Sequence, residues 1–309
     1  MKRQGWVSNR LTLVSLALFV FLAHMQAHNY LFNKQLSTQT NLFIPDNTAI
    51  ASRLCSRHRE VLYGIFSIPT KAKTWTVARQ QQHCEMNNEM HQTVFVVGSP
   101  RTTSDQEIII NESKAHGDVF ILSCEENMNE GKTFFYFKEA LEQFPCFNFY
   151  AKVDDDTAFT PQRLSARISV VPNNEPLLIG RNSKILDTIF DKYIGKSMQF
   201  FYRDMTWYHS LQNYTAGMLY ILNTQAVKRW TALKSVQLYG DEDFRTTYYM
   251  TLIGAKVVNL DTTFHDYMKY ETHPYQDHWK LEITHDSLAV HKCKSLNDLS
   301  DAFAAICTA

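Results

Sequence analysis

The chain has 309 residues, of which 45% are hydrophobic, and it includes 20 Phe and 15 Tyr. This apolar content is enough for a sizeable core and excludes wholesale disorder. Basic and acidic residues number 31 each, so the formal net charge is zero, which argues against a nucleic-acid-binding protein because such proteins carry a basic excess.

The N-terminus combines a basic flank with an uncharged apolar run. Three basic residues, ending with Arg10, precede LTLVSLALFVFLA at residues 11–23. A cleaved signal peptide and an uncleaved signal-anchor both fit this pattern. The following AHMQAH is a poor cleavage site, which favours an anchor at residues 11–27 with a cytosolic tail at residues 1–10 and a lumenal remainder.

The next segment, residues 28–55, is rich in Ser, Thr and Asn and shows no convincing period. It is typical of a stem that joins a membrane to a folded domain, here expected at residues 56–309. Six cysteines and the glycosylation sequons at Asn111 and Asn213 are compatible with an oxidising lumen. The cysteines can form up to three disulfides, whose connectivity the sequence leaves open, or some of them can remain free and buried.

From about residue 60 the sequence alternates between strand and helix patterns. Short runs of β-branched and aromatic residues predict strands at residues 60–68, 93–98, 118–122, 147–153, 176–180 and 255–260. Helical spacing and capping signals predict helices at residues 129–144, 160–168, 223–233 and 241–254. This alternation indicates an α/β fold with a largely parallel sheet, whose ligand lies at the carboxyl ends of the strands.

Three consecutive aspartates follow the predicted strand FNFYAKV: Asp154, Asp155 and Asp156. A solvated acidic loop is one interpretation, and a site for Mn²⁺ or Mg²⁺ is the other, because these cations prefer clustered carboxylate oxygens. An EF-hand is excluded because Phe159 and Ser165 stand where that loop needs Gly and Glu. A phosphatase-type D-x-D-x-T pattern fails at Ala158. A metal that bridges a nucleotide diphosphate fits a strand–D-x-D–turn best.

Several segments resemble, in order and spacing, those of the family 31 β-1,3-glycosyltransferases, which include β-1,3-galactosyltransferases and Fringe-like enzymes. FNFYAKVDDDTAFTPQRL is similar to the family's K-x-D-D-D-x-F segment, NYTAGMLYILNTQAVKRW to its Y-x-x-G-x-x-Y segment, and YGDEDFRTTYYMTLIG to its E-D-V segment. GIFSIPTKAKTWTVAR and TVFVVG resemble its first two strands and the helix between them. The resemblance covers about residues 60–295. It implies a GT-A-type nucleotide-sugar-binding fold, with a mostly parallel central sheet flanked by helices, in a single-pass type II Golgi membrane protein.

The resemblance also implies a function. The expected reaction is an inverting, metal-dependent transfer of galactose or N-acetylglucosamine from a UDP-sugar to a glycan or glycoprotein acceptor, with a β-1,3 linkage. Asp156 would bind Mn²⁺ (or Mg²⁺) directly, Asp154 would bind it or lie nearer the ribose, and His291 would complete the metal site, with His285 in reserve. A catalytically silent lumenal carbohydrate-binding protein on the same fold is the alternative.

The remaining site residues follow from the same family patterns. The family's R-x-T-W is not cleanly present, and counting from Pro69 places Arg79 at its arginine. Three residues are expected to contact the donor: Arg79, Lys132 and Asp154. Asp155 is expected to shape the turn or to contact the donor sugar. Asp243 matches the family's base, with Glu242 and Asp241 as close competitors, and Asp241 is also the expected helix cap. The sequence does not identify the acceptor or the oligomeric state.

Overall fold

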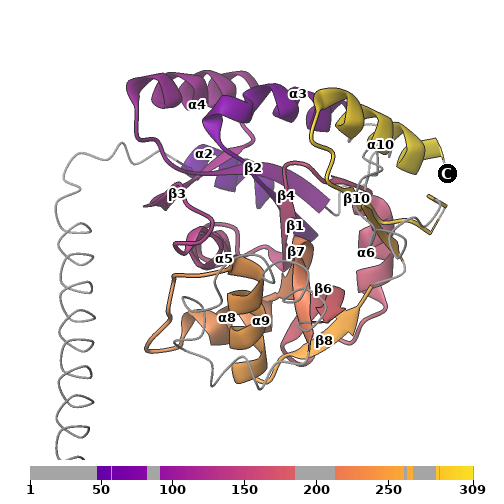
Figure 1. The fold of residues 1–309 in the computed structure, drawn as a ribbon. Helices are drawn as coiled ribbons and strands as arrows, with labels where there is room; N and C mark the ends of the chain where they lie inside the picture. Colours follow the sequence, from indigo (N-terminus) through magenta and orange to yellow (C-terminus); the bar gives the residue numbers. More distant parts are fainter. Residues whose placement is uncertain are drawn as a thin grey trace, which may run out of the picture. The chain divides into compact units, whose positions relative to one another are not determined.

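The computed structural model of the chain describes residues 47–56, 58–81, 91–184, 213–260, 263–266, 283–284 and 286–308 (Figure 1). The chain divides between Ile44 and Pro45 into two units, and all described residues belong to the second unit. The predicted cytosolic tail, the predicted anchor, most of the predicted stem and His285 lie outside the described residues. Within the described part, no helix is both long enough and apolar enough to cross a membrane.

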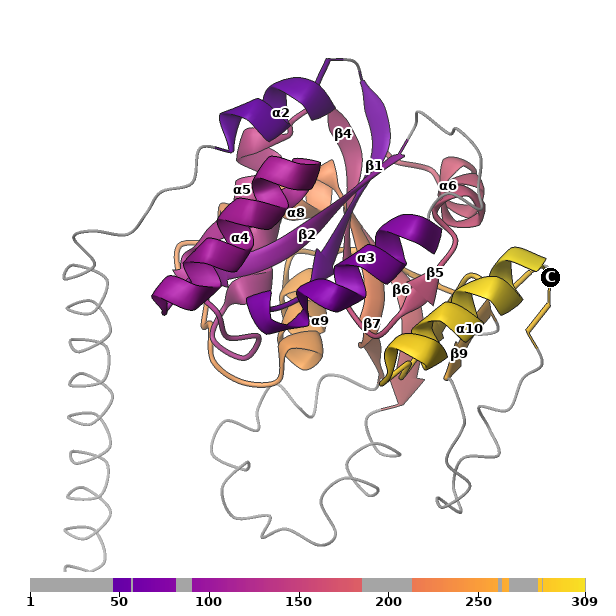
Figure 2. The ribbon, with the colours of Figure 1, turned by 90° about the horizontal axis from the view of Figure 1, so that it is seen from above.

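A seven-stranded sheet forms the centre of the folded unit, in the order β3-β2-β1-β4-β7-β6-β8 (Figure 1), and Figure 2 shows its middle strands from above. Its strands are β1 (Arg59–Phe66), β2 (His91–Ser99), β3 (Val119–Glu125), β4 (Phe147–Asp154), β6 (Leu177–Lys184), β7 (Asn213–Asn223) and β8 (Lys256–Asn259). The first four strands of that order pair in parallel, as do β6 and β8, whereas β7 is antiparallel to β4 and β6. The prediction of a largely parallel sheet is confirmed.

A smaller sheet lies beside the end of β4. It contains β5 (Ala158–Phe159), β10 (Ala289–His291) and β9 (Phe264–Asp266), in that order. β10 is antiparallel to β5 and parallel to β9. The last helix, α10 (Leu296–Thr308), packs its apolar face on β5 and β10 through Leu299 and Phe303.

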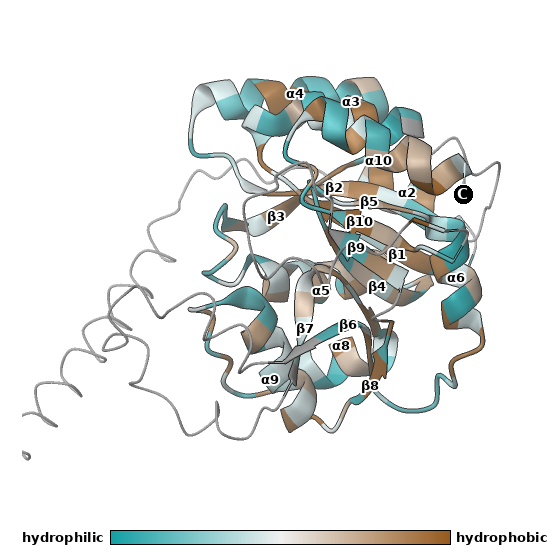
Figure 3. Cartoon of the chain, turned by 45° about the vertical axis from the view of Figure 1, so that its right-hand side comes forward, coloured by the Kyte–Doolittle hydropathy of each residue, from teal (hydrophilic) through white to brown (hydrophobic). Residues whose placement is uncertain are grey.

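Helices cover both faces of the large sheet. They are α2 (Thr48–Leu54), α3 (Ala72–Gln81), α4 (Thr103–His116), α5 (Lys132–Gln143), α6 (Pro161–Ser169), α8 (Thr224–Thr231) and α9 (Glu242–Leu252), with a short 3-10 turn, η1, at Pro69–Lys71. One buried cluster joins the sheet to α3, α4 and α6, and a second joins its other face to α2, α5, α8 and α9. Figure 3 shows hydrophobic residues concentrated on the strands and hydrophilic ones on the exposed helix surfaces.

Helix ends follow local sequence signals. The Asn223 side chain caps α8 by accepting a hydrogen bond from the amide of Ala226 at 2.9 Å, as the sequence predicts. Gly254 adopts φ +71° just after α9, a conformation that glycine takes at little cost. At α6, Pro161 occupies the first helical turn, but the preceding Thr160 makes no side-chain capping bond.

The end of the predicted stem belongs to the folded unit. Residues 48–54 form α2, which buries Ile50 and Leu54 one helical turn apart. Ile50 and Leu54 are the only large apolar residues of this helix, so its sequence shows no clear helical period. The stem boundary expected at residue 55 therefore falls after the first helix of the folded unit.

The cysteines do not form three disulfides. Cys55 is bonded to Cys146, with their Cα atoms 5.4 Å apart, and this bond ties α2 to the turn before β4. Cys307 also takes part in a disulfide. Cys124 and Cys293 are free and buried. The alternative that some cysteines are free, buried thiols is therefore the correct one for these two.

Candidate active site

The aspartates lie where the strand order of the large sheet reverses. From β1 the chain builds β2 and β3 on one side and then returns on the other side of β1 as β4. Phe66, the last residue of β1, pairs in register with Asp154, the last residue of β4. In open α/β sheets, ligands bind outside the carboxyl ends of strands at such a switch point. The fold therefore places Asp154–Asp156 at its expected ligand site.

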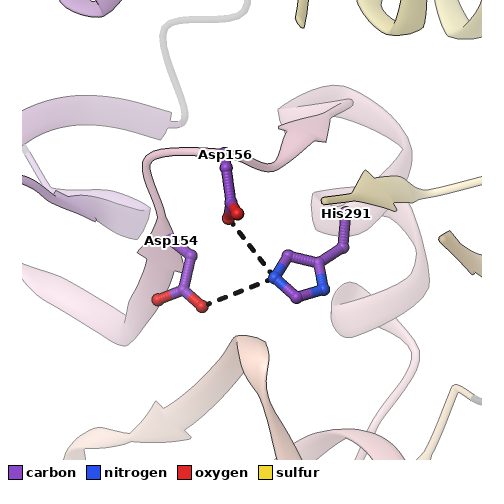
Figure 4. Close-up of side chains that lie close together, drawn as sticks. All are labelled: Asp154, Asp156 and His291. Atoms are coloured by element: carbon purple, nitrogen blue, oxygen red, sulfur yellow. Dashed lines mark ion pairs between the residues drawn. The ribbon is translucent and has the colours of Figure 1, made fainter. Parts of the chain in front are cut away.

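Two aspartates and a histidine converge there. The His291 Nε2 atom lies 3.8 Å from Asp154 Oδ2 and 3.3 Å from Asp156 Oδ1 (Figure 4). One ligand atom from each of the three residues fits within 4.8 Å of the others. The three side chains are 28%, 13% and 18% exposed, in the order Asp154, Asp156 and His291, so the cluster is accessible from solvent.

Pairing between β5 and β10 brings His291 to the aspartates. Val290 is opposite Ala158, and the backbone amide of Cys293 donates to the Asp156 carbonyl at 3.0 Å. These contacts fix β10 beside the turn that follows β4. The two carboxylates and one imidazole are a donor set that suits Mn²⁺ and also Mg²⁺, and three protein ligands leave positions for phosphate oxygens and water.

Lysines surround the aspartates. The Lys71 ammonium donates to Asp155 Oδ1 at 2.8 Å, and the Ser67 hydroxyl donates to Asp155 Oδ2 at 2.8 Å. Lys294 forms an ion pair with Asp156. Although burial opposes ionisation, His291 and Lys294 hold the pKa of Asp156 well below its usual range. Asp156 is therefore a carboxylate at any working pH.

A buried lysine connects the aspartates with α9. Lys152 Nζ lies 2.7 Å from Asp154 Oδ1 and 3.2 Å from Glu242 Oε2, and it donates to the Gly217 carbonyl. Burial opposes its charge, but Asp154 and Glu242 raise the pKa of Lys152 above its ordinary value. The second oxygen of Glu242 accepts a hydrogen bond from the Tyr220 hydroxyl. Both oxygens of Glu242 are thus engaged.

Asp243 is next to Glu242 in the first turn of α9. One of its oxygens accepts a hydrogen bond from the Phe244 amide at 2.8 Å, and the side chain is half-buried. Burial, together with the charge of Glu242, raises the pKa of Asp243 to about 7. A carboxyl group with such a pKa suits general base catalysis near neutral pH. Asp241 occupies the N-cap position but makes no side-chain capping bond, so its predicted capping role is wrong.

Arg79 and Lys132, both predicted to contact the donor, are engaged within the protein. Arg79 binds Asp118 with Nε and Nη2, each at 2.7 Å, and Glu112 with Nη1 at 2.6 Å. Asp118 directly precedes β3, so this arginine lies toward the amino ends of the strands. The structure brings Lys71, and not Arg79, to the aspartates.

Lys132 is buried beneath the site. It donates to the Ser67 carbonyl at 2.8 Å and to Glu126 Oε1 at 2.6 Å, and burial lowers its pKa. Since the Ser67 hydroxyl binds Asp155, Lys132 supports the segment that holds this aspartate. A direct contact between Lys132 and the donor stays a prediction.

The sequence did not predict three lysines of the site: Lys71, Lys152 and Lys294. Lys152 had a usable signal, because residues two apart on a strand share one face and Asp154 is its i+2 neighbour. Lys294 follows His291 by three residues, with no pattern that marks it. Lys71 directly precedes α3, the helix that contains Arg79, and only the three-dimensional contact with Asp155 identifies it.

An α/β fold with a carboxylate-rich site at its switch point suits a ligand that binds at the carboxyl ends of the strands together with a divalent cation. The galactosyltransferase family model matches residues 72–277, and the chain belongs to this family. The resemblance to the β-1,3-galactosyltransferase-like enzymes is thereby confirmed, and the protein is a glycosyltransferase.

Several solved structures to which the chain is similar are glycosyltransferases. They include the apo WbbM bifunctional enzyme (TM-score 0.49, 11% identity, 81% of this chain and 50% of that one). A second is galactosyltransferase LgtC with donor and acceptor sugar analogs (TM-score 0.46, 8% identity, 81% of this chain and 95% of that one). A third is the mannosyltransferase PcManGT from Pyrobaculum calidifontis with GDP-Man and Mn²⁺ (TM-score 0.42, 11% identity, 80% of this chain and 66% of that one). The chain thus spans half the length of WbbM. No curated protein sequence matches it.

Proposed function

We propose that this glycosyltransferase moves galactose from UDP-galactose to a glycan or glycoprotein acceptor, with inversion and a β-1,3 linkage, in a metal-dependent reaction. The observation that carries the proposal is the convergence of Asp154, Asp156 and His291 at the switch point of the sheet. Galactose is preferred because the family model is that of galactosyltransferases, and N-acetylglucosamine is the second choice.

The donor diphosphate would lie at the carboxyl end of β4. A bound Mn²⁺ or Mg²⁺ would neutralise the charge of the departing UDP as a Lewis acid. Asp154, Asp156 and His291 would hold that ion. One Asp154 oxygen is bonded to Lys152, so its Oδ2 atom is the one that faces His291. Asp155 is held by Ser67 and Lys71, which fits a role in shaping the turn.

Asp243 would remove the proton from the acceptor hydroxyl. Inversion requires attack from the face opposite the leaving group, with a base on the acceptor side. Of the three acids predicted for this role, Glu242 has both oxygens bound by Lys152 and Tyr220. Asp243 accepts one backbone hydrogen bond and has a pKa of about 7, so it can take up and release a proton near neutral pH.

The proposed location is the Golgi membrane, with residues 11–27 as a type II anchor and the catalytic unit in the lumen. The Cys55–Cys146 disulfide supports this location, because such bonds persist in oxidising compartments. Protease protection of intact vesicles tests it. A secreted form that begins near residue 28 as the major species would favour the signal peptide instead.

UDP release by the purified full-length chain tests the proposed function. The protein is incubated with UDP-galactose or UDP-N-acetylglucosamine, and with Mn²⁺ or EDTA. We expect hydrolysis or transfer only with metal, faster with UDP-galactose. Binding of UDP-sugars without turnover of any donor, across a panel of β-linked acceptors, would favour the silent carbohydrate-binding alternative.

A further inference from the structure

Lys152 is a fully enclosed charge at the site. Its side chain is 1% exposed, and its ammonium faces acceptors on three different elements. These are Asp154 on β4, Glu242 on α9 and the Gly217 carbonyl on β7. An ammonium group has three protons to donate, so this set satisfies it completely.

Strand geometry explains how one lysine reaches all three. Residues two apart on a strand share a face, which puts Asp154 beside Lys152. In the antiparallel β4–β7 pair, Lys152 is directly opposite Tyr220, whose hydroxyl binds the other oxygen of Glu242. The lysine and the tyrosine therefore hold the Glu242 carboxylate from both sides.

Gly217 leaves the room for this ion pair. A Cβ atom at position 217 would lie 3.3 Å from Glu242 Oε2, 3.4 Å from Lys152 Nζ and 3.5 Å from the Asp243 Cβ atom. Only the first of these distances is shorter than an ordinary contact of a carbon atom, and the other two are ordinary contact distances. Glycine thus keeps this position free of a side chain that would press on the Glu242 carboxylate.

The two neighbouring acids of α9 consequently have different surroundings. Glu242 is bound by Lys152 and Tyr220. Within the described part of the chain, the hydrogen bond to Asp243 comes from the Phe244 amide, and Lys152 acts on this carboxylate only through its charge. The Glu242 carboxylate is thus held by side chains on both oxygens, whereas the Asp243 carboxylate next to it is not.

We propose that Lys152 is a positioning residue for catalysis, because it fixes Glu242 and Asp154 in one ion-paired arrangement. Asp243 is then the carboxylate that remains to take the proton from the acceptor hydroxyl. The inference rests on the proposed role of Asp243 as the base. Stability alone does not require this arrangement, because buried ion pairs can often be replaced by apolar side chains without loss.

The neighbouring charges should shift the pKa of Asp243 in opposite directions. The charged groups that face Asp243 are Glu242 and Asp241 on its own helix and Lys152 on β4, while Tyr220 on β7 is uncharged. Removal of the lysine charge should make Asp243 harder to ionise, whereas removal of the Glu242 charge should make it easier. A nearby charge shifts a pKa by roughly 1 to 3 units.

The experiment compares Lys152→Met, Glu242→Gln and the double variant with the parent protein. For each, kcat with UDP-galactose is measured against pH at saturating Mn²⁺, and the melting temperature is measured at each pH. The midpoint is the pH at which kcat is half its maximum on the acid side of the profile. We expect this midpoint to rise by about one pH unit in Lys152→Met, to fall in Glu242→Gln and to lie between these two values in the double variant. Lys138→Met is the matched control, because Lys138 is a half-exposed lysine on α5 that pairs with Glu142, and it should move nothing.

Shifts of the midpoint in opposite directions in the two single variants would distinguish a positioning role of Lys152 from a purely structural one. A lower melting temperature and kcat in Lys152→Met with an unmoved midpoint would overturn the inference. If Lys152→Met does not fold, the double variant, which removes both charges together, decides the question: recovery of folding with parental kcat would overturn the proposal, and recovery of folding with kcat still at least tenfold low would support it.

Asp243→Asn tests the assignment of Asp243 as the base separately from the role of Lys152. Near-normal kcat in Asp243→Asn would refute the base assignment itself. Loss of kcat in Asp243→Asn with an unmoved midpoint in Lys152→Met would refute only the role of the lysine. A readout without turnover is the pH dependence of the melting-temperature difference between each background and its Asp243→Asn derivative, which follows the pKa of Asp243 directly.

Discussion

His291 Nε2 lies 3.3 Å from Asp156 Oδ1, although the two residues belong to segments far apart in the sequence. The short β5–β10 pairing and the Cys293–Asp156 backbone bond hold them together. Lys292, directly after the histidine, has φ +66°, the only positive φ of a residue other than glycine in the described ranges. This sparsely populated conformation follows directly on the end of β10, and the next residue, Cys293, bonds to the Asp156 carbonyl.

Asp243→Asn should lower kcat by roughly 10² to 10⁴, because the amide keeps the shape of the carboxylate but cannot accept the acceptor proton. Steady-state kinetics with UDP-galactose measures this, and the affinity for UDP should barely change. In the parent protein kcat should rise with pH through a midpoint near 7, since only the carboxylate form acts as a base. Asp241→Asn is the neighbouring control and should retain activity. Loss of UDP binding in Asp243→Asn would make Asp243 a donor-site residue.

Asp243 should also make stability depend on pH. Its pKa is about 7 in the folded protein against a reference value of 3.8, so its stabilising contribution is complete below about pH 4 and is lost as the pH rises through 7. Asp243→Asn removes the cost of a half-buried charge. We expect the variant to exceed the parent in stability by roughly 2 to 4 kcal/mol at pH 8, with a small difference at pH 4. Denaturant unfolding at the two pH values measures it, and equal differences at both would contradict the burial of this group.

Lys71 and Arg79 should separate donor binding from stability. Lys71→Met should raise the KM for UDP-galactose with little change in melting temperature, because its half-exposed ammonium faces Asp155. Arg79→Met should leave KM unchanged and cost roughly 3 kcal/mol of stability, because it leaves Asp118 and Glu112 partly buried without their cation. The reverse outcome would restore the donor-binding role predicted for Arg79 from the sequence.

The Cys55–Cys146 disulfide should contribute substantially to stability. It spans 91 residues, and closing a loop of that length is worth roughly 4 kcal/mol through the unfolded chain. Thermal unfolding of the Cys55→Ser/Cys146→Ser variant should show a lower melting temperature than the parent. Cys124→Ala, which removes a free buried thiol, is the matched control and should cost less. Equal losses in the two variants would mean that α2 is held by packing alone.

The strands of the large sheet could mostly be predicted from the sequence, because β-branched and aromatic runs bounded by Gly or Pro mark them. The sequence does not predict β7 as a strand, because the run from Met218 to Leu222 is continuously apolar and such a short run does not distinguish a strand from a buried helix. Its residues do resemble a family segment. α4 was missed because its one fully buried hydrophobic residue, Ile109, gives no helical period. β5 and β10 pair over only two residues, a contact too short for any sequence pattern.

The same limit applies to the site. A strand followed by Asp154 and Asp156 is visible in the sequence, and His291 was expected only through the family resemblance. Lys71 meets Asp155 through the turn after β1, and Lys294 meets Asp156 through the turn after β10. Such contacts depend on how loops return to the sheet, which residue spacing does not encode.

The central claim is that Asp154, Asp156 and His291 form a divalent metal site for the donor diphosphate. Isothermal titration of UDP into the full-length protein, with Mn²⁺ or with EDTA, tests it most directly. We predict metal-dependent UDP binding in the parent protein, its loss in Asp156→Ala and in His291→Ala, and its retention in Asp286→Ala, an exposed aspartate that pairs with Arg167. UDP affinity in Mn²⁺ that stays unchanged in Asp156→Ala and His291→Ala would contradict the metal site.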